Sequence, residues 1–370
     1  MKTIHIKPII LAFIFLTIPL VAKSQETITS QAWQEDLDYL QKQVHEDFPF
    51  LFKKIEQTTW DKEVANFRAQ IPKLQDHEIK VGLTRMVSLF EYGHTQIPFS
   101  TIAREAVLPV NLYHFKDGIY IEGVHKDHHT TLGAKLIRIN GLTVDEALAK
   151  IRPVVPVEND QYFKAYGLRF LTVPAVLHAQ GVLADFSTEV TLTLEKEGST
   201  FDYTFPSIPF KAMSRDYNLT IPNEDWLSVR RDGETPLYLK HLNDKYFYYE
   251  YLQELQTLYV RQSSVFDHPD EKLKDFYARL FEFIDTHKVE KLVYDVRLNG
   301  GGNNYNNKTF IQGIMARPQL NAKGKFFYII GRNTFSACQN LTNEVENYTE
   351  AIMIGAVSYT HLTLPTTPYV

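Results

Sequence analysis

Short apolar segments alternate with amphipathic segments over residues 235–358, and this alternation limits the folds open to the chain. The apolar segments are YFYYEYL at 246–252, KLVYDV at 291–296 and KFFYII at 325–330. Between the first two, residues 268–288 carry apolar side chains at helical spacing. Strands that alternate with helices predict an α/β layer with a largely parallel sheet.

Loops at the carboxyl ends of such strands are where ligands bind in α/β sheets. The first loop is DVRLNGGGNN, with three successive glycines at 300–302. Glycines allow backbone conformations closed to other residues and let a ligand come close, so these amides could face an oxyanion. An ordinary strand-to-helix turn is the alternative. A phosphate loop is a weaker one, because GxGxxG and GxxxxGK[ST] are absent.

The second loop is GRNTFSACQN, residues 331–340, which leads from an apolar segment into a predicted helix. The positive end of a helix favours negative charge developing near Ser336, and the Ala337 amide can donate to an oxyanion. On this loop alone, helix capping by Ser336 or Thr334 is the simpler explanation. Cys338, the single cysteine, could be the nucleophile instead, but its apolar neighbours indicate a packing role.

A serine nucleophile needs a base. His94 is the candidate, because it directly follows FEYG at the end of a predicted helix. Gly93 is expected to leave that helix in a left-handed conformation. Asp295 and Arg297 lie at the end of a predicted buried strand. We expect an ion pair that supports the glycine loop, and the alternative is that the pair is part of the site itself.

The chain upstream of the α/β part divides into two regions. Residues 30–92 show helical periodicity in three segments, whereas residues 104–200 change to strand periodicity. There, KDG between LYHF and IYIEGV predicts a β-hairpin, and Thr143 with Glu146 predicts a capping box. Residues 200–235 are polar and contain prolines, which indicates a linker or a long irregular crossing.

Residues 1–24 predict a secretory signal peptide. Lys2 and Lys7 precede an apolar run, and the small residues Ala22 and Ser24 follow it. A membrane anchor is the alternative, but the run is short for a membrane span. We therefore expect an exported protein, periplasmic or extracellular, with no stable membrane insertion after cleavage.

Composition excludes several classes of function. Removing the three lysines of residues 1–24 changes the formal net charge from −5 to −8, and no basic block is present, so nucleic acid is not expected as a partner. A single cysteine cannot form an internal disulfide. The 13 histidines are scattered apart from His128 and His129, and CxxC and HExxH are absent, so neither metal nor cofactor is expected.

Together these segments resemble the family of C-terminal processing, or tail-specific, serine peptidases. That family shows two motifs at strand ends, D-x-R-x-N-x-G-G and then T-x-S-A. They are matched here by Asp295, Arg297, Asn299, Gly301 and Gly302, and by Thr334, Ser336 and Ala337. The resemblance covers most of the chain after residue 24.

The resemblance implies a multidomain α+β chain. Its parts would be an N-terminal helical domain at 25–97, a β-rich PDZ-like domain at 98–200, a linker at 201–234 and an α/β catalytic domain of the crotonase or ClpP type at 235–358. The implied reaction is hydrolysis of peptide bonds through an acyl-enzyme, on peptides or unfolded proteins, without a cofactor. The resemblance says nothing of the oligomeric state.

The resemblance also implies roles for single residues. Ser336 would be the nucleophile, with oxyanion donors from the amides of Gly301 or Gly302 and of Ala337. YGHTQI is similar to the histidine motif of the tricorn core protease branch, which implies His94 as the general base. The residues implied to support this site are Asp295, Arg297, Asn299 and Gly93.

Residues 359–370, YTHLTLPTTPYV, depart from the family pattern. AIMIGAVS begins the expected next strand, but neither the glycines nor the sheet-closing strands follow, and the last segment resembles a translated sequencing adapter. We expect the native sequence to end near Val357 or Ser358, with 359–370 a non-native tail in which His361 is not catalytic. The acidic partner of the histidine would then be missing, the catalytic domain incomplete, and this chain could lack activity.

Two other functions stay open on the sequence. One is a non-catalytic peptide- or ligand-binding relative with the same fold, and the other is a crotonase-like hydrolase of small esters. The predicted signal peptide and PDZ-like part favour the peptidase over the esterase.

Overall fold

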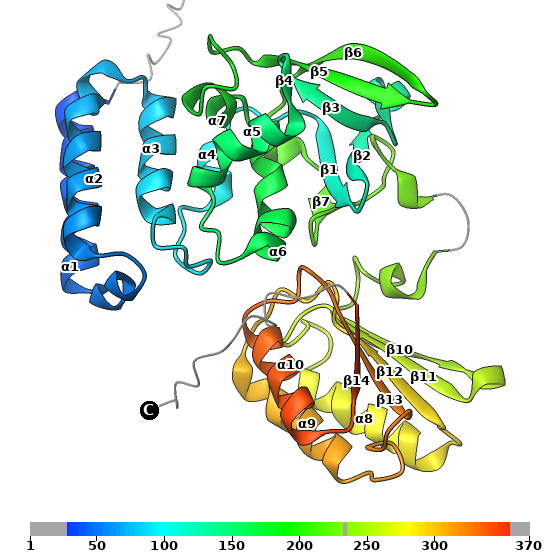
Figure 1. Cartoon of the computed structure of the whole chain (residues 1–370). Coiled ribbons are helices and arrows are strands. Elements are labelled where there is room, and N and C mark those ends of the chain that lie inside the picture. The colour runs from blue at the N-terminus through cyan, green and yellow to red at the C-terminus, as the bar shows by residue number, and fades with distance from the viewer. Residues whose placement is uncertain (1–27, 232–234, 356–370) are drawn as a thin grey trace, which may run out of the picture.

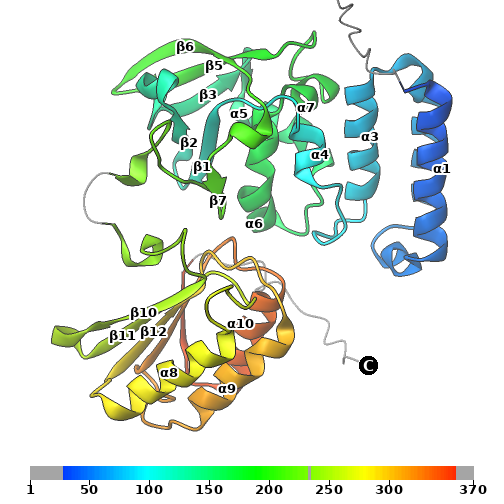
Figure 2. The same ribbon diagram turned by 180° about the vertical axis from the view of Figure 1, so that it is seen from behind.

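The computed structural model describes residues 28–231 and 235–355, so the predictions for residues 1–24 and 359–370 lie outside the described residues. The chain is mixed α/β with several sheets. N-terminal helices stand beside a β-rich part, and a five-stranded sheet with its helices forms the C-terminal part (Figure 1). The same three parts are seen from behind (Figure 2). Within the described residues, no helix is long and apolar enough to cross a membrane.

Three helices form the N-terminal part and confirm the periodicity of residues 30–92. They are α1 (Ser30–Glu46), α2 (Gln57–Gln70) and α3 (Asp76–Ser88). Trp60, Phe67 and Phe90 are buried in the core between them. The expected left-handed glycine is wrong, because α3 ends before it and Glu91, not Gly93, takes a positive φ of 47°.

The β-rich part is a seven-stranded sheet with short helices on one side. Strands β1 and β2 form the predicted hairpin, and Thr143 and Glu146 form the predicted capping box of α5. Helices α4, α5 and α7 lie between α3 and the sheet (Figure 1). The helices are α4 (Phe99–Ala103), α5 (Val144–Ile151), α6 (Asp160–Tyr162) and α7 (Pro174–Ala179). The sheet comprises β1 (Val110–Phe115), β2 (Gly118–His125), β3 (Lys135–Ile139), β4 (Leu142–Thr143), β5 (Glu189–Lys196), β6 (Ser199–Pro206) and β9 (Trp226–Ser228).

The sequence predicts a linker at residues 201–234, but the structure shows strands in this segment. Most of β6 lies there, followed by the two-stranded sheet of β7 (Arg215–Asp216) and β8 (Leu219–Thr220), and β9 pairs with β2. The polar composition of this segment concealed the pairing, because some of its polar groups bond to a buried charge on β2. The Glu122 carboxylate on β2 is fully buried and accepts from the Thr220 amide and the Ser228 hydroxyl. A buried carboxylate requires such partners, so the segment is anchored to the sheet.

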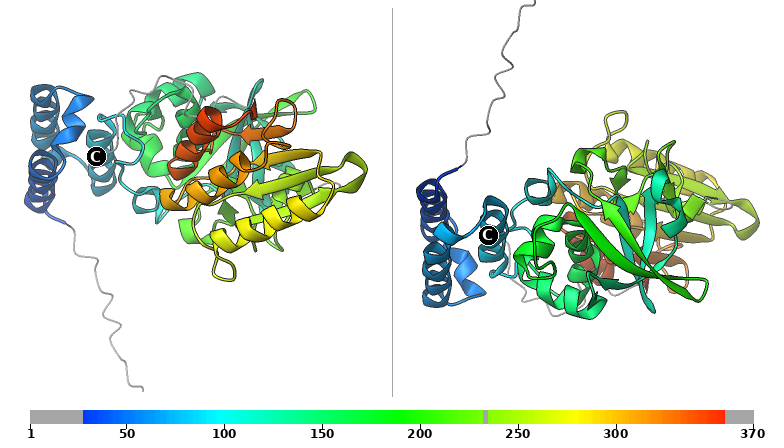
Figure 3. Two further views of the ribbon diagram at one scale, coloured as in Figure 1. Left: turned by 90° about the horizontal axis from the view of Figure 1, so that it is seen from below. Right: turned by 90° about the horizontal axis from the view of Figure 1, so that it is seen from above.

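The C-terminal part confirms the predicted α/β layer. Strand order is β10-β11-β12-β13-β14, with β10 antiparallel to β11 and the other pairs parallel. The strands are β10 (Phe247–Leu252), β11 (Thr257–Gln262), β12 (Lys291–Asp295), β13 (Phe326–Ile330) and β14 (Ile352–Gly355). Helices α8 (Leu273–Thr286), α9 (Asn307–Met315) and α10 (Ala337–Tyr348) lie side by side against this sheet and share one core with it (Figure 3).

Candidate active site

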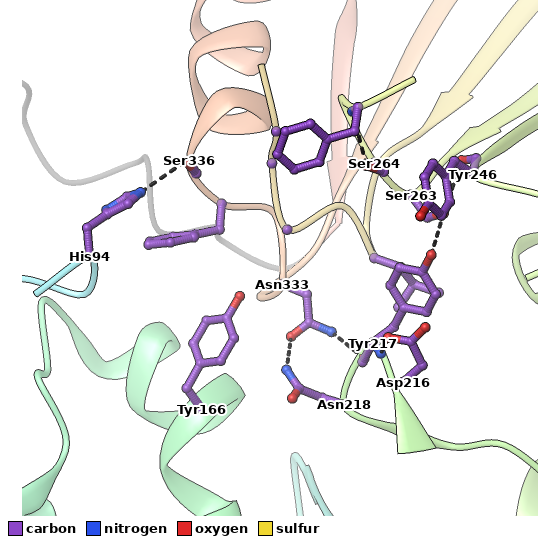
Figure 4. Close-up of a pocket in the computed structure, with 16 residues that line it drawn as sticks. His94, Tyr166, Asp216, Tyr217, Asn218, Tyr246, Ser263, Ser264, Asn333 and Ser336 are labelled. Atoms are coloured by element: carbon purple, nitrogen blue, oxygen red, sulfur yellow. Dashed lines mark hydrogen bonds between the residues drawn. The ribbon is translucent and has the colours of Figure 1, made fainter. Parts of the chain in front are cut away.

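Ser336 and His94 meet although 242 residues separate them in the chain. His94 Nε2 lies 2.9 Å from Ser336 Oγ, which is hydrogen-bond distance (Figure 4). Ser336 is at the carboxyl end of β13, directly before α10, and His94 is on the loop after α3. The structure therefore brings together the predicted nucleophile and the predicted base from two different parts of the chain.

Ser336 stands in a strained backbone conformation. Its φ is 55° and its ψ is −127°, a region that residues with a Cβ rarely adopt. It occupies the N-cap position of α10, yet its side chain makes no capping hydrogen bond. The alternative that Ser336 serves as a helix cap is therefore not supported, and its hydroxyl is directed to His94 instead.

Thr334 holds the loop that leads to the serine. Its hydroxyl donates to the Val296 carbonyl at 3.0 Å and accepts from the Gly331 amide at 3.0 Å. The side chain is fully buried, so these bonds are shielded from water. Thr334 thus ties the end of β13 to the end of β12 and does not cap α10.

Asn299 connects the two predicted loops. Its side-chain amide donates to the Gln262 carbonyl at 3.1 Å, and its side-chain oxygen accepts from the Gly301 amide at 2.9 Å. Its own carbonyl accepts from the Phe335 amide at 3.0 Å. Because Asn299 is fully buried, it fixes the glycine loop relative to the residue before Ser336.

The glycine loop approaches the serine closely. A Cβ on Gly301 would lie 2.6 Å from the Ser336 Cβ and 3.0 Å from the Ala337 nitrogen, and its φ is 106°. Only glycine fits such a position. The Gly301 amide is already engaged by Asn299, whereas the amides of Gly302 and Ala337 donate to no residue that the structure describes. This pattern favours Gly302 over Gly301 as an oxyanion donor.

The His94 side chain is exposed overall, although its ring contacts the rings of Phe335 and Tyr92. Its ring stacks on Phe335 with centroids 4.4 Å apart, and partial burial lowers its pKa below the ordinary value of 6.5. The imidazole is therefore neutral at neutral pH, as a general base must be. Within residues 28–231 and 235–355, no carboxylate bonds to His94.

Asp295 and Arg297 form the expected ion pair. Arg297 Nη2 lies 2.8 Å from Asp295 Oδ2 and its Nε lies 2.9 Å from Oδ1. Tyr259 also donates to the buried carboxylate at 2.8 Å. The pair braces the turn after β12, and neither side chain contacts Ser336 or His94 through a described hydrogen bond.

Cys338 belongs to the core. Its side chain is fully buried beside Tyr328, and burial raises the pKa of the thiol well above its ordinary value. A thiolate is the reactive form of cysteine, so this side chain is not suited to nucleophilic attack. The packing interpretation of Cys338 fits the structure.

Residues of the β-rich part contact the nucleophile loop, and no sequence motif indicates these contacts. Asn333 accepts from Asn218 Nδ2 at 3.0 Å and donates to the Tyr217 carbonyl at 3.1 Å (Figure 4). Arg332 donates to the His114 carbonyl at 2.7 Å and lies over the Tyr113 ring. These partners are more than 100 residues apart in the chain. The periodicity of a single sequence does not indicate which distant segments pack together.

An open cavity of about 600 Å³ adjoins the two candidate catalytic side chains. Its wall includes the aromatic side chains Tyr166, Tyr217, Tyr246 and Phe266, with the glycine loop on one side (Figure 4). In the described part of the chain, no group of three or more histidine, cysteine, aspartate or glutamate side chains is arranged to hold a metal ion. The chemistry this arrangement offers is that of a hydroxyl nucleophile with an imidazole base.

Comparison with known proteins finds similar solved structures but no similar sequence family. No family model matches the sequence, and no curated protein matches it. The chain is similar to mature CPAF, solved with lactacystin, at a TM-score of 0.59 and 11% identity, over 89% of this chain and 85% of that chain. It also aligns with the photosystem II D1 C-terminal processing protease at a TM-score of 0.35 and 10% identity, over 89% and 82% of the two chains.

The likeness to mature CPAF shows the fold and nothing finer. It confirms the mixed α/β architecture that the sequence predicts. The PDZ-like and crotonase-like layout and its domain boundaries remain predictions.

Proposed function

We propose that this protein is a serine-type peptidase in which Ser336 is the nucleophile and His94 is the general base. One observation carries the proposal, namely the 2.9 Å contact between His94 Nε2 and Ser336 Oγ. The strained serine at a helix start and the neutral imidazole support it. The two strand-end motifs favour the peptidase family over other uses of the same dyad.

The first half of the reaction would form an acyl-enzyme. Ser336 Oγ attacks the carbonyl carbon of a peptide bond, His94 Nε2 takes the hydroxyl proton, and the carbonyl electron pair moves onto oxygen. When the tetrahedral intermediate collapses, the C–N bond breaks and protonated His94 gives its proton to the leaving amine.

Water completes the cycle. It attacks the ester carbon while His94 takes one of its protons, and the proton returns to Ser336 Oγ as the acid product leaves. Throughout, the amides of Gly302 and Ala337 would donate to the oxyanion. Losing one such donor costs about 3 kcal/mol of transition-state stabilisation in a serine protease.

The substrate class follows from the cavity and the sequence. An open, partly aromatic cavity suits an extended peptide with apolar side chains. The signal-like residues 1–24 support export, so the substrates would be periplasmic or extracellular peptides or unfolded proteins. A formal net charge of −5, which becomes −8 if residues 1–24 are removed, and the absence of a basic block do not favour nucleic acid.

Hydrolysis of a quenched, fluorescently labelled unfolded polypeptide tests this proposal. The protein should cleave it, and Ser336→Ala should lower the rate by at least about 1000-fold. Cys338→Ala is the matched control and should stay active. Cleavage that survives Ser336→Ala would contradict the proposal.

A non-catalytic binding protein is the second candidate, because the described residues provide no carboxylate for His94. Such a protein would bind the unfolded polypeptide without cleaving it. Equal binding by the parent chain and by Ser336→Ala, with no cleavage by either, would favour this candidate.

A further inference from the structure

Glu158 lies beside the loop that carries His94, although it belongs to the β-rich part. It follows the short helix η4 (Arg152–Val154) and precedes α6. One oxygen of its carboxyl group accepts a short hydrogen bond from the Gly93 amide, the residue directly before His94. No other carboxyl group of the described residues reaches this loop through a hydrogen bond.

Gly93 is closely enclosed by Glu158 and by Tyr162 of α6. A Cβ on Gly93 would lie 2.5 Å from the Tyr162 ring and 2.9 Å from Glu158 Oε1. The Tyr162 hydroxyl lies 3.4 Å from the Gly93 carbonyl, so both the amide and the carbonyl of Gly93 face groups of the β-rich part. This close fit explains why residue 93 is a glycine. The sequence instead suggests a left-handed helix end at this position.

Tyr162 also connects this corner to the nucleophile loop. Its ring lies 5.9 Å from the ring of Phe335, on which His94 stacks. Glu158 and Tyr162 therefore hold one side of the His94 loop, and Phe335 holds the ring itself. Their arrangement sets where Nε2 meets Ser336.

We propose that Glu158 is a positioning residue for His94, which fixes the loop by accepting the Gly93 amide. This inference rests on the proposed function for its kinetic part. Glu158 touches no reacting atom, and its effect would pass through Gly93 to the orientation of the imidazole. Geometric errors of about 1 Å in a catalytic group can cost about 100-fold in rate.

The protonation state of the Glu158 carboxyl group should make the positioning of the His94 loop depend on pH. Burial raises the pKa of Glu158 to about 7, and the Gly93 amide and the charge of Lys54 oppose that rise. The groups that face it are Lys54, the Tyr162 phenol and the Gly93 amide. Since a carboxylate accepts a stronger hydrogen bond than a neutral carboxyl group, the loop should be held more firmly as pH rises through 7.

Steady-state kinetics of Glu158→Gln and Glu158→Ala test the positioning. Glu158→Ala should lower kcat by about 10- to 100-fold and leave KM within about twofold, because the substrate site is intact. Glu158→Gln keeps the shape and an acceptor oxygen, so it should lose less activity and lack the rise in kcat near pH 7. Glu344→Gln is the matched control, since burial also raises the pKa of Glu344 on α10, and no described hydrogen bond or ion pair joins Glu344 to this loop. Unchanged kcat in Glu158→Ala, or a retained step near pH 7 in Glu158→Gln, would overturn the proposal.

Hydrogen exchange gives a readout that does not depend on catalysis. Backbone amides of residues 89–98 should exchange faster in Glu158→Ala than in the parent chain at the same pH, and Glu344→Gln should leave them unchanged. Faster exchange in a protein that cleaves nothing would refute the proposed function while supporting the positioning by Glu158. Equal exchange in all three proteins would refute the positioning even if the parent chain is active.

Discussion

Ser336 has a backbone conformation that serine rarely adopts, and this bears on its role. With φ at 55° and ψ at −127°, its Cβ crowds the adjoining peptide groups. Surrounding contacts from Thr334 and Asn299 maintain this geometry. Strain of this kind is found at functional sites, where it presents a side chain that a relaxed turn would hide.

Substituting Ser336→Gly should make the protein more stable than Ser336→Ala. Glycine accepts a positive φ at no steric cost, so the difference in unfolding free energy should be about 1 kcal/mol or more. Urea unfolding of both variants measures this difference. Equal stabilities would mean that Ser336 is not strained in solution.

The lowered pKa of His94 predicts how activity varies with pH. Protonated His94 cannot accept the serine proton, so kcat/KM should rise as pH passes through a value below 6.5. The sign follows because burial disfavours the charged imidazole, which keeps the base neutral to lower pH. A pH profile of kcat/KM checks this. A value of kcat/KM that decreases as pH rises from about 5 to 6.5 would contradict it.

At the scale of elements, the carboxyl ends of β12 and β13 are what bring the glycine loop to the serine. The parallel order of these strands could be read from KLVYDV and KFFYII, because buried parallel strands are continuous apolar runs. The fully buried β11 was not identified, since TLYVRQ carries Arg261 and Gln262 within it. Arg261 Nη2 donates to the backbone carbonyls of Lys240 and His241. The side-chain oxygen of Gln262 accepts from the Tyr294 hydroxyl. These partners are distant in sequence, so a sequence pattern does not reveal them.

Replacing either of two neighbouring glycines by alanine should affect stability to very different extents. Gly301→Ala would place its Cβ 2.6 Å from the Ser336 Cβ at a φ of 106°, so it should lower the unfolding free energy by roughly 1–3 kcal/mol. Gly300→Ala meets nothing within 4 Å and should be close to neutral. Chemical unfolding of both variants checks the contrast, and similar losses would argue against the close approach.

At the scale of the whole molecule, the site is assembled from parts that are distant in sequence. The base follows the N-terminal helices, and the nucleophile belongs to the C-terminal part. Tyr217 and Asn218 lie between them in the sequence and contact the nucleophile loop. Sequence motifs identified Ser336 and His94 because each lies in a short recognisable segment. Glu158, Tyr162 and Asn333 were missed, because their roles come from packing alone.

Asn218 and Asn333 should be energetically coupled. Their side chains are hydrogen-bonded at 3.0 Å across the junction between the β-rich and C-terminal parts, and Asn333 is buried. A double-mutant cycle of Asn218→Ala and Asn333→Ala should give an interaction energy of about 0.5–3 kcal/mol. The exposed pair Asn304 and Asn340, bonded within the C-terminal part, should show less. Additive effects at the junction would indicate that the two parts do not meet as described.

If Ser336 is an activated nucleophile served by His94, it should react covalently with an electrophilic probe. A fluorophosphonate probe should modify the peptide that contains Ser336, as read by mass spectrometry. Labelling should disappear in Ser336→Ala, slow strongly in His94→Ala and persist in Cys338→Ala. Absence of labelling in the parent chain, or equal labelling of Ser336→Ala, would mean that Ser336 is not an activated nucleophile.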